Sequence, residues 1–289
     1  RRMSETSGLV DAAARARDFR VLALDLDGTV VTGDYRLSDR VVRAVARFRE
    51  GGRLLFVASG RARISSFPWV ARLGGADGLS AFNGAAVWDG PAARDPEGAP
   101  FFRVGLSECV ARELLAHARR SGLDFHVWSG EKWYYEARTP GVDFYEARSG
   151  LPGAVVDFDA VDELRWSKLM FVAPEARLAA FAPRLREALG EKALVVSTGV
   201  SMLEVVPPGV SKAAALDAWL SRRGLSRAEV LAFGDAENDL DMLLAAGVGV
   251  AMADGPETVR AAVGRVCPPV GDDGVALWLE EWLDARGGA

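Results

Sequence analysis

Short apolar runs alternate with amphipathic stretches along the first part of the chain. The runs at 21–24 and 54–58 consist of Val, Leu, Phe and Ala and end in small polar residues, which is typical of buried parallel strands that enter loops. Between them, Val41 to Phe48 has apolar residues at helical spacing, and Ser38 before it is a suitable N-cap. This order of strand, helix and strand predicts a βαβ unit.

The pattern changes after a second helix, bent or broken near Pro68, and a third predicted strand at 78–85. Residues 89–100 are rich in Pro, Gly and Asp, which favours a linker or hairpin loop. From about 87 to 208 the chain then predicts a separate α+β domain. Its predicted strands lie at 101–104, 124–128, 133–137, 168–172, 193–197 and 202–206, and its predicted helices at 107–120 and 174–189.

Beyond residue 208 the alternation of apolar strands and amphipathic helices that is typical of a parallel sheet resumes. It predicts a helix at 211–223, strands at 230–233 and 248–252, and helices at 257–263 and 273–285. The predicted fold class is therefore α/β, with a Rossmann-like parallel-sheet core formed by residues 1–86 and 209–289 and an inserted α+β cap domain at 87–208. Residues 4–19 predict only a frayed helix or an arm.

Composition narrows the function classes. The chain has 289 residues, 49% of them hydrophobic, and a formal net charge of −5, so it predicts globular domains without the basic surface that nucleic acid requires. Cys109 and Cys267 fit no metal-ligand spacing and are expected to be reduced thiols. With His117 and His126 as the two histidines, a histidine-based triad or zinc site is nearly excluded.

Targeting signals are weak in this sequence. No apolar signal-peptide core follows the opening Arg1-Arg2-Met3, and Met3 is a plausible start. The mainly apolar run at 243–253 is too short and too rich in Gly to span a bilayer. We therefore expect a cytoplasmic protein that binds neither a membrane nor nucleic acid. The sequence leaves its oligomeric state open.

Polar residues gather where the predicted parallel strands end. Asp25 and Asp27 follow the first strand. Two carboxylates that share a site push one pKa up unless a counter-charge is present, so we expect a bound divalent cation, Mg²⁺. The alternative is a solvated Asp-Gly turn. Three further groups of polar residues lie at strand ends or helix starts at the same level of the predicted sheet. Each also has a structural explanation without function, namely a turn, a solvated cation and an N-cap. They are Ser59, Lys212, and Asp235 with Asn238 and Asp239.

In this order and spacing the chain resembles the haloacid dehalogenase superfamily, specifically the Cof-type phosphatases with an inserted α/β cap. The resemblance extends from about 20 to 280 and rests on four motifs. They are Asp25-Leu26-Asp27-Gly28-Thr29, Val57-Ala58-Ser59-Gly60-Arg61, Gly209-Val210-Ser211-Lys212-Ala213 and Gly234-Asp235-Ala236-Glu237-Asn238-Asp239. Ala213 departs from the Gly usual in the family, and the stretch at 249–254 lacks the Gly-Asn that usually follows Met.

The resemblance implies a Mg²⁺-dependent phosphomonoester hydrolase of a small phosphorylated metabolite, such as a sugar phosphate or a phosphorylated cofactor. Asp25 would form an aspartyl-phosphate, and Asp27 would serve as general acid and base. Mg²⁺ would be held by the side chains of Asp25 and Asp235 and the carbonyl of Asp27, with waters ordered by Asp239. The implied phosphate-binding residues are Ser59, Lys212 and Asn238.

Substrate choice is expected to come from the insert, because the core would contact only the phosphoryl group. Most insert aromatics, such as Trp128 and Tyr145, are expected to be core residues. Arg61 and Asn83 are candidates for contacting substrate or closing the cap. Two alternatives stay open, namely a phosphotransferase or mutase of the same family and a non-catalytic metabolite-binding module.

Overall fold

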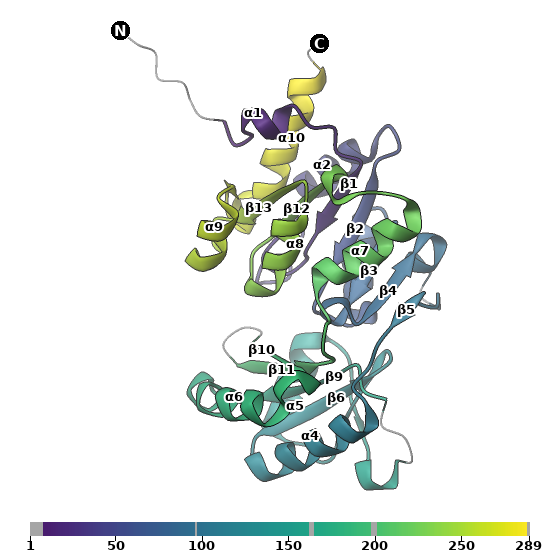
Figure 1. Cartoon of the computed structure of the whole chain (residues 1–289), viewed down its shortest axis with the longest axis vertical. Helices are drawn as coiled ribbons and strands as arrows, with labels where there is room; N and C mark the ends of the chain where they lie inside the picture. Colours follow the sequence, from purple (N-terminus) through teal and green to yellow (C-terminus); the bar gives the residue numbers. More distant parts are fainter. Residues whose placement is uncertain (1–7, 96, 162–164, 198–200, 288–289) are drawn as a thin grey trace. The chain divides into compact units, whose positions relative to one another are not determined.

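The protein folds into two compact units in a computed structural model that describes residues 8–95, 97–161, 165–197 and 201–287 (Figure 1). Unit 1 comprises Arg1–Gly60, Ser66–Phe101 and Ser211–Ala289, and unit 2 comprises Arg61–Ser65 and Phe102–Val210. Part of the predicted N-terminal arm, residues 4–7, lies outside the described residues. The rest of that arm contains one short helix, α1 (Ala12–Arg15).

Unit 1 is built on a mainly parallel sheet. Every pairing from β14 through β3 is parallel, and β4 runs antiparallel to β3. The strand order within unit 1 is β14 (Val266–Cys267), β13 (Val248–Met252), β12 (Val230–Gly234), β1 (Val21–Leu24), β2 (Leu54–Ala58), β3 (Gly78–Ala81) and β4 (Ala86–Asp89). The predicted α/β class is confirmed, and β1, β2, β12 and β13 lie where the apolar runs placed them.

The predicted third strand at 78–85 is wrong in its second half. β3 ends at Ala81, and Phe82 and Asn83 then adopt left-handed φ angles of 53° and 57°. Left-handed residues cannot continue an extended strand, so the chain reverses there and returns as β4. The apolar run carried no sign of this reversal except the Asn-Gly pair at 83–84.

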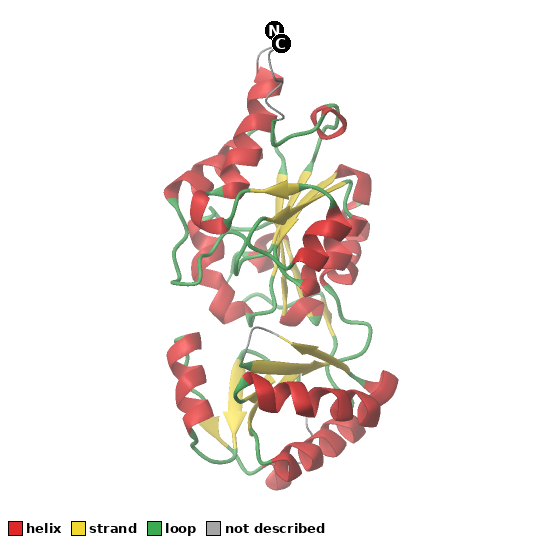
Figure 2. Ribbon diagram, turned by 90° about the vertical axis from the view of Figure 1, so that its left-hand side faces the viewer, coloured by secondary structure: helices red, strands yellow, loops and turns green. Residues whose placement is uncertain are grey.

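Helices lie on both sides of the unit 1 strands (Figure 2). α7 (Lys212–Arg223), α8 (Leu240–Ala245) and α9 (Glu257–Val263) pack through an apolar cluster against one face of the sheet. α10 (Gly274–Gly287) packs against α2 (Asp39–Arg49) and contacts Phe233 of β12 through Trp278. α3 (Arg63–Arg72) continues through Pro68 as a single helix.

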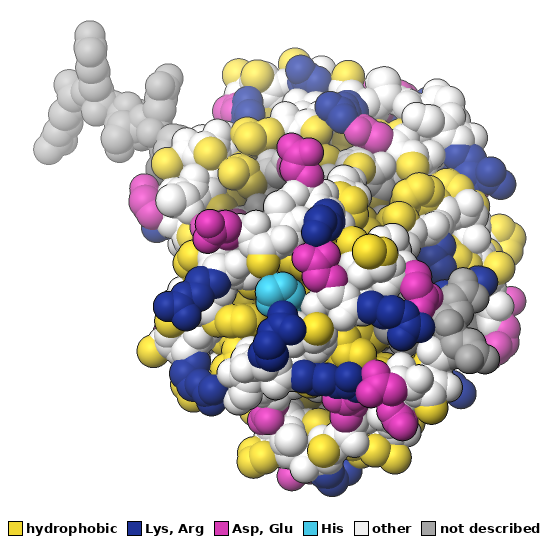
Figure 3. Space-filling view, turned by 60° about the horizontal axis from the view of Figure 1, so that its bottom comes forward, with side chains coloured by type: hydrophobic (Ala, Val, Ile, Leu, Met, Phe, Trp, Pro, Cys, Tyr) yellow, Lys and Arg dark blue, Asp and Glu magenta, His cyan; other side chains and the backbone are white. Residues whose placement is uncertain are grey.

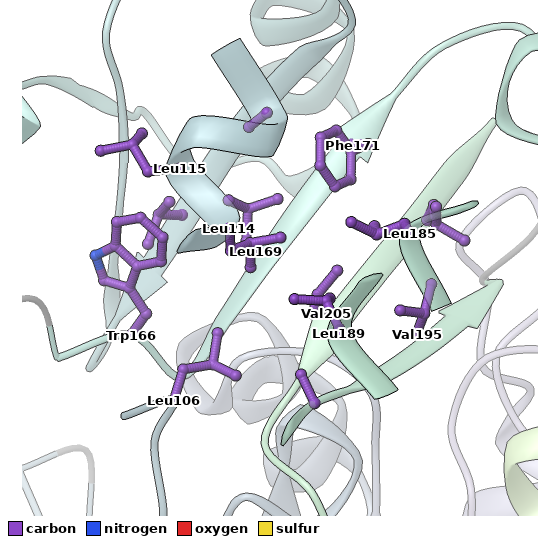
Figure 4. Close-up of a cluster of buried hydrophobic side chains, with 14 of the residues drawn as sticks. Leu106, Leu114, Leu115, Trp166, Leu169, Phe171, Leu185, Leu189, Val195 and Val205 are labelled. Carbon is purple, nitrogen blue, oxygen red and sulfur yellow. The ribbon is translucent and has the colours of Figure 1, made fainter. Parts of the chain in front are cut away.

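Unit 2 contains a six-stranded sheet whose helices are divided between its faces. The strand order is β10 (Leu194–Ser197), β11 (Met202–Val206), β9 (Lys168–Val172), β6 (Asp124–Ser129), β7 (Lys132–Tyr135) and β8 (Ala154–Val155). α4 (Glu108–Ser121) and α6 (Glu175–Leu189) pack on one face, where Leu114, Leu169, Phe171 and Leu185 form part of a continuous apolar core (Figure 4).

α5 (Pro140–Ser149) is a helix that the apolar pattern did not predict. It packs against β6, where the indole nitrogen of Trp128 donates a hydrogen bond of 3.0 Å to the hydroxyl of Tyr145. These two aromatic side chains are buried, as expected for insert core residues. The helix could have been found from its ends, because Thr139 caps it, Pro140 is its first residue and Gly150 closes it in a left-handed conformation.

The chain passes from unit 1 to unit 2 after Phe101 and returns at Ser211. The insert boundary expected near residue 87 falls inside β4, which pairs with β3 and so belongs to the unit 1 sheet. The boundary expected near 208 lies close to the observed return.

On the face seen in Figure 3, Lys and Arg side chains are interspersed with Asp and Glu side chains and do not gather into one basic area. Among the described residues, no helix is both long and apolar enough to cross a membrane.

Candidate active site

The site begins at the carboxyl end of β1, in the middle of the unit 1 sheet. All four residues of β1 are buried, and Asp25 continues the pairing by donating its backbone N–H to the carbonyl of Phe233 at 3.1 Å. The loop then closes on itself, since the N–H groups of Gly28 and Val31 bind the carbonyls of Val31 and Leu26. Asp25 is thereby buried at 4% exposure, whereas the side chain of Asp27 is exposed.

Gly28 lets a second carboxylate approach this loop. Its φ is +80°, and a Cβ at this position would lie 2.4 Å from Oδ2 of Asp235. Thr29, which is 1% exposed, donates its hydroxyl to Oδ1 of Asp235 at 3.2 Å. We assigned neither residue a role from the sequence, although both belong to the Asp-Gly-Thr motif that follows Asp27. They bring Asp235 toward the first strand.

Lys212 connects two of the predicted acids. Ser211 caps α7 by accepting a hydrogen bond from the N–H of Ala214, which makes Lys212 the first residue of that helix. The Lys212 side chain is 1% exposed, and its Nζ lies 2.6 Å from Oδ1 of Asp25 and 2.5 Å from Oδ1 of Asp239. Burial alone would lower the pKa of Lys212, but the two carboxylates outweigh it and raise that pKa, so the ammonium stays charged.

Asp235 and Asp239 are fixed by the turn after β12. Oδ2 of Asp239 accepts hydrogen bonds from the backbone N–H groups of Asp235 and Ala236 at 3.1 and 3.0 Å, while its Oδ1 faces Lys212. Gly234 makes room for this turn, because a Cβ there would lie 2.5 Å from Cβ of Asp239. Asp239 is completely buried and Asp235 is half-buried.

Three carboxylates share this site. Asp25, Asp235 and Asp239 each offer an oxygen that lies within 4.8 Å of the other two. Burial raises the pKa of Asp25 well above its usual value even though the Lys212 charge lowers it, and burial together with the Asp239 charge raises the pKa of Asp235 to about 7. Two buried acids and one half-buried acid beside a single lysine would carry an excess of negative charge, so their oxygen donors suit a hard divalent cation.

Ser59, Asn83 and Asn238 form a second group in unit 1. The N–H of Ser59 binds the carbonyl of Ser80 at 3.1 Å, and the carbonyl of Ser59 accepts the N–H of Asn83 at 3.0 Å. Nδ2 of Asn238 donates to Oδ1 of Asn83 at 2.9 Å. The structure therefore links the predicted phosphate-binding residues Ser59 and Asn238 through Asn83, whereas Arg61 is half-buried and belongs to unit 2.

A parallel α/β sheet with buried carboxylates and a buried lysine at its carboxyl edge defines a class of hydrolase cores. The chain belongs to the haloacid dehalogenase-like hydrolases, whose family model matches residues 22–279. This finding confirms the resemblance that the four motifs indicated.

Among its relatives, an HMP-PP phosphatase from Cronobacter sakazakii is 30% identical over 268 residues, which cover 92% of this chain and 96% of that protein. A haloacid dehalogenase-like hydrolase from Bacteroides thetaiotaomicron has a similar structure, with a TM-score of 0.81, 28% identity and coverage of 91% of this chain and 99% of its own. A phosphatase of this superfamily from the same organism has a TM-score of 0.77 at 25% identity, covering 96% and 99%. The protein is a haloacid dehalogenase-like phosphatase.

Proposed function

We propose that the protein is a Mg²⁺-dependent phosphomonoester hydrolase that acts on a small phosphorylated metabolite through an aspartyl-phosphate on Asp25. One observation carries this proposal. Lys212 contacts both Asp25 and Asp239 inside the protein, and Asp235 completes a group of three converging carboxylates. A nucleophilic carboxylate that attacks an anionic phosphoryl group needs positive charge close by, and this arrangement brings a lysine and a cation-binding group to the same point.

The residues present fit a magnesium ion. We assign Asp25, Asp235 and the backbone carbonyl of Asp27 as its protein ligands and assign Asp239 to order its waters. Carboxylate and carbonyl oxygens are the donors that Mg²⁺ prefers, and the buried acids supply the negative charge that holds it. When bound, the ion would polarise the phosphoryl group and offset charge that develops during transfer.

The chain's own residues perform the bond changes in two steps. In the first, an Asp25 oxygen bonds to phosphorus while the bond from phosphorus to the ester oxygen breaks, and Asp27 gives that oxygen its proton. In the second, Asp27 takes a proton from water, whose oxygen bonds to phosphorus as the bond between phosphorus and the Asp25 oxygen breaks. Lys212 contacts Oδ1 of Asp25, so we assign the attack to Oδ2. Asp27 is exposed, which lets it exchange protons with water.

Ser59, Lys212 and Asn238 are proposed to bind the phosphoryl oxygens, and the insert to select the rest of the substrate. Arg61 is proposed to contact substrate from the loop that follows Ser59. Relatives at 30% and 29% identity are HMP-PP phosphatases, which supports a small phosphorylated metabolite as the substrate. A sugar phosphate and a phosphorylated cofactor are the two substrate classes that the family resemblance implies.

The test is phosphate release from a panel of phosphomonoesters and diphosphates that includes HMP-PP, first with Mg²⁺ and then with excess EDTA. We expect release with Mg²⁺ and its loss with EDTA. Asp25→Asn should abolish release because an amide cannot form the aspartyl-phosphate, while its melting temperature shows that the fold persists. Asp284→Asn, at an exposed carboxyl of α10, is the matched control and should keep full activity. Activity retained in Asp25→Asn would contradict the mechanism.

A further inference from the structure

Asn83 lies in a turn that is strained for ordinary residues. Phe82 and Asn83 have φ angles of 53° and 57°, and Gly84 follows with a φ of 107°. Two successive residues with a Cβ in the left-handed region cost stability, and such turns persist only where their surroundings hold them. Asn83 is nevertheless buried at 4% exposure, and the turn makes three contacts inside unit 1.

The first of these contacts is with the loop that follows β2. The N–H of Asn83 binds the carbonyl of Ser59 at 3.0 Å. A Cβ on Gly60 would lie 2.9 Å from Oδ1 of Asn83, so the asparagine packs directly over the glycine. The turn therefore fixes the backbone that directly follows the Ser59 side chain.

The second contact is with the start of α7. A Cβ on Gly84 would lie 2.3 Å from the carbonyl oxygen of Ser211. Ser211 is the N-cap of α7, and Lys212 is the first residue of that helix. Close packing between Gly84 and the Ser211 backbone fixes the position of the start of α7, and with it the position of Lys212.

The third contact is with Asn238, in the turn after β12. Oδ1 of Asn83 accepts a hydrogen bond from Nδ2 of Asn238 at 2.9 Å. An amide nitrogen carries two hydrogens, and this bond uses one of them. It also decides which end of the Asn238 amide faces the turn, since an oxygen in that place would repel Oδ1 of Asn83.

We propose that Asn83 is a positioning residue, which ties the phosphoryl-binding residues Ser59 and Asn238 together and orients the Asn238 amide so that its second N–H is presented to a phosphoryl oxygen. This inference rests on the proposed phosphatase function. It differs from a direct substrate contact by Asn83, because the side chain acts through Asn238.

The test uses Asn83→Gly, which suits the left-handed backbone and keeps the N–H that binds Ser59, but removes the acceptor for Asn238. We expect KM and the inhibition constant of inorganic phosphate each to rise about tenfold, as for one lost oriented hydrogen bond, with kcat changed by less than about threefold. Isothermal calorimetry with inorganic phosphate and Mg²⁺ should show the same weakening without turnover. Melting curves check that the variant is folded.

Asn238→Ala and the double variant complete a double-mutant cycle. Because Asn83 acts through Asn238, the double variant should be no weaker toward phosphate than Asn238→Ala alone. Asp273→Gly, which replaces another residue of left-handed φ outside this turn, is the matched control and should leave both constants unchanged.

The outcomes separate the two claims. A wild-type protein that neither binds phosphate nor releases it from any ester overturns the proposed function and this inference with it. A wild-type protein that turns over while Asn83→Gly keeps its KM and phosphate affinity overturns the positioning role alone. Additive effects of Asn83→Gly and Asn238→Ala also overturn it.

Discussion

Lys168 and Glu204 form a buried ion pair between β9 and β11 of unit 2. Nζ of Lys168 lies 2.5 Å from Oε1 of Glu204, and the two residues are 2% and 3% exposed. His126 lies in the same region, since the charge of Lys168 acts on it and its ring stacks 4.0 Å from that of Tyr145. At the scale of single residues, unit 2 therefore holds charge inside an apolar fold, where removing one partner costs more than removing both.

Lys168→Met should destabilise the protein by about 3–5 kcal/mol, because it removes one partner of a buried ion pair. The double variant Lys168→Met with Glu204→Leu should recover most of that loss. Urea unfolding of the three proteins measures both effects. The control is Lys192→Met, which removes an exposed pair with Glu113 and should cost less than about 1 kcal/mol. A loss below about 1 kcal/mol for Lys168→Met would contradict the prediction.

His126 should make stability fall with acid. Burial, assisted by the Lys168 charge, lowers the pKa of His126 to about 3, whereas the unfolded chain binds this proton near pH 6.5. Protons then favour the unfolded state as the pH falls from about 6.5 toward 3, so this stability is present at neutral pH and lost in acid.

His126→Phe keeps a ring at this position and removes the proton site. Between pH 7 and pH 5 the wild type should lose about 2 kcal/mol more than this variant, as measured by urea midpoints. His117→Gln, at the half-buried histidine of α4, is the control. An equal loss in the wild type and His126→Phe would refute the role of His126.

At the scale of elements, close approach of a helix to the sheet fixes the site. Gly78 of β3 is one point of approach, because a Cβ there would lie 2.5 Å from the ring of Trp219 in α7 and 2.6 Å from Phe56 in β2. The indole N–H of Trp219 also donates to Oδ1 of Asp89 in β4 at 2.8 Å. This packing holds α7 against the sheet, and α7 begins with Lys212.

Gly78→Ala should therefore overpack the interface between β3 and α7. We expect the free energy of unfolding to fall by about 1–3 kcal/mol. KM should rise because the start of α7 shifts. Gly271→Ala is the matched control, since nothing lies within 4 Å of a Cβ at that glycine. Unchanged stability in Gly78→Ala would show that the helix can move away without cost.

Sequence prediction at this scale succeeded where the apolar pattern alone decided the element. For the buried strands and for the capped helix α2, the apolar spacing and the residues at the ends indicate the same type of element. It failed at the reversal after Ala81, where φ angles decide, and at α5, whose apolar residues do not repeat at helical spacing. Backbone reversals and helices held by contacts with a sheet are tertiary effects that a local pattern carries weakly.

At the scale of the whole molecule, the proposed cation site forms only when the chain folds. The three carboxylates of the site come from β1 and from the turn after β12, which are distant in sequence and meet only in the folded chain. A cation that binds this group but not the unfolded chain stabilises the folded state by mass action. The pKa values of Asp25 and Asp235 are raised because their charged forms are unfavourable in the folded chain, and a bound cation would stabilise those charged forms.

Mg²⁺ at about 100 times its dissociation constant should raise the unfolding free energy by about 2.7 kcal/mol and so raise the melting temperature by several degrees. Differential scanning fluorimetry with Mg²⁺ and with EDTA measures the shift. Asp235→Asn should remove most of it, and the surface variant Asp284→Asn should keep it. A melting temperature that does not respond to Mg²⁺ would contradict a cation site at these acids.

The sequence by itself determined the α/β class and the family and nominated the candidate site residues, because motif spacing and the apolar strands before each motif are local properties of the chain. Only the tertiary structure decided which of those residues touch. The contact of Lys212 with Asp25 and Asp239, and the bond between Asn238 and Asn83, join positions far apart in sequence. The physical reason is that such contacts depend on the order of the strands in the sheet and on glycines that allow close approach. The local pattern of apolar and polar residues indicates neither the strand order nor which glycines lie at a close approach.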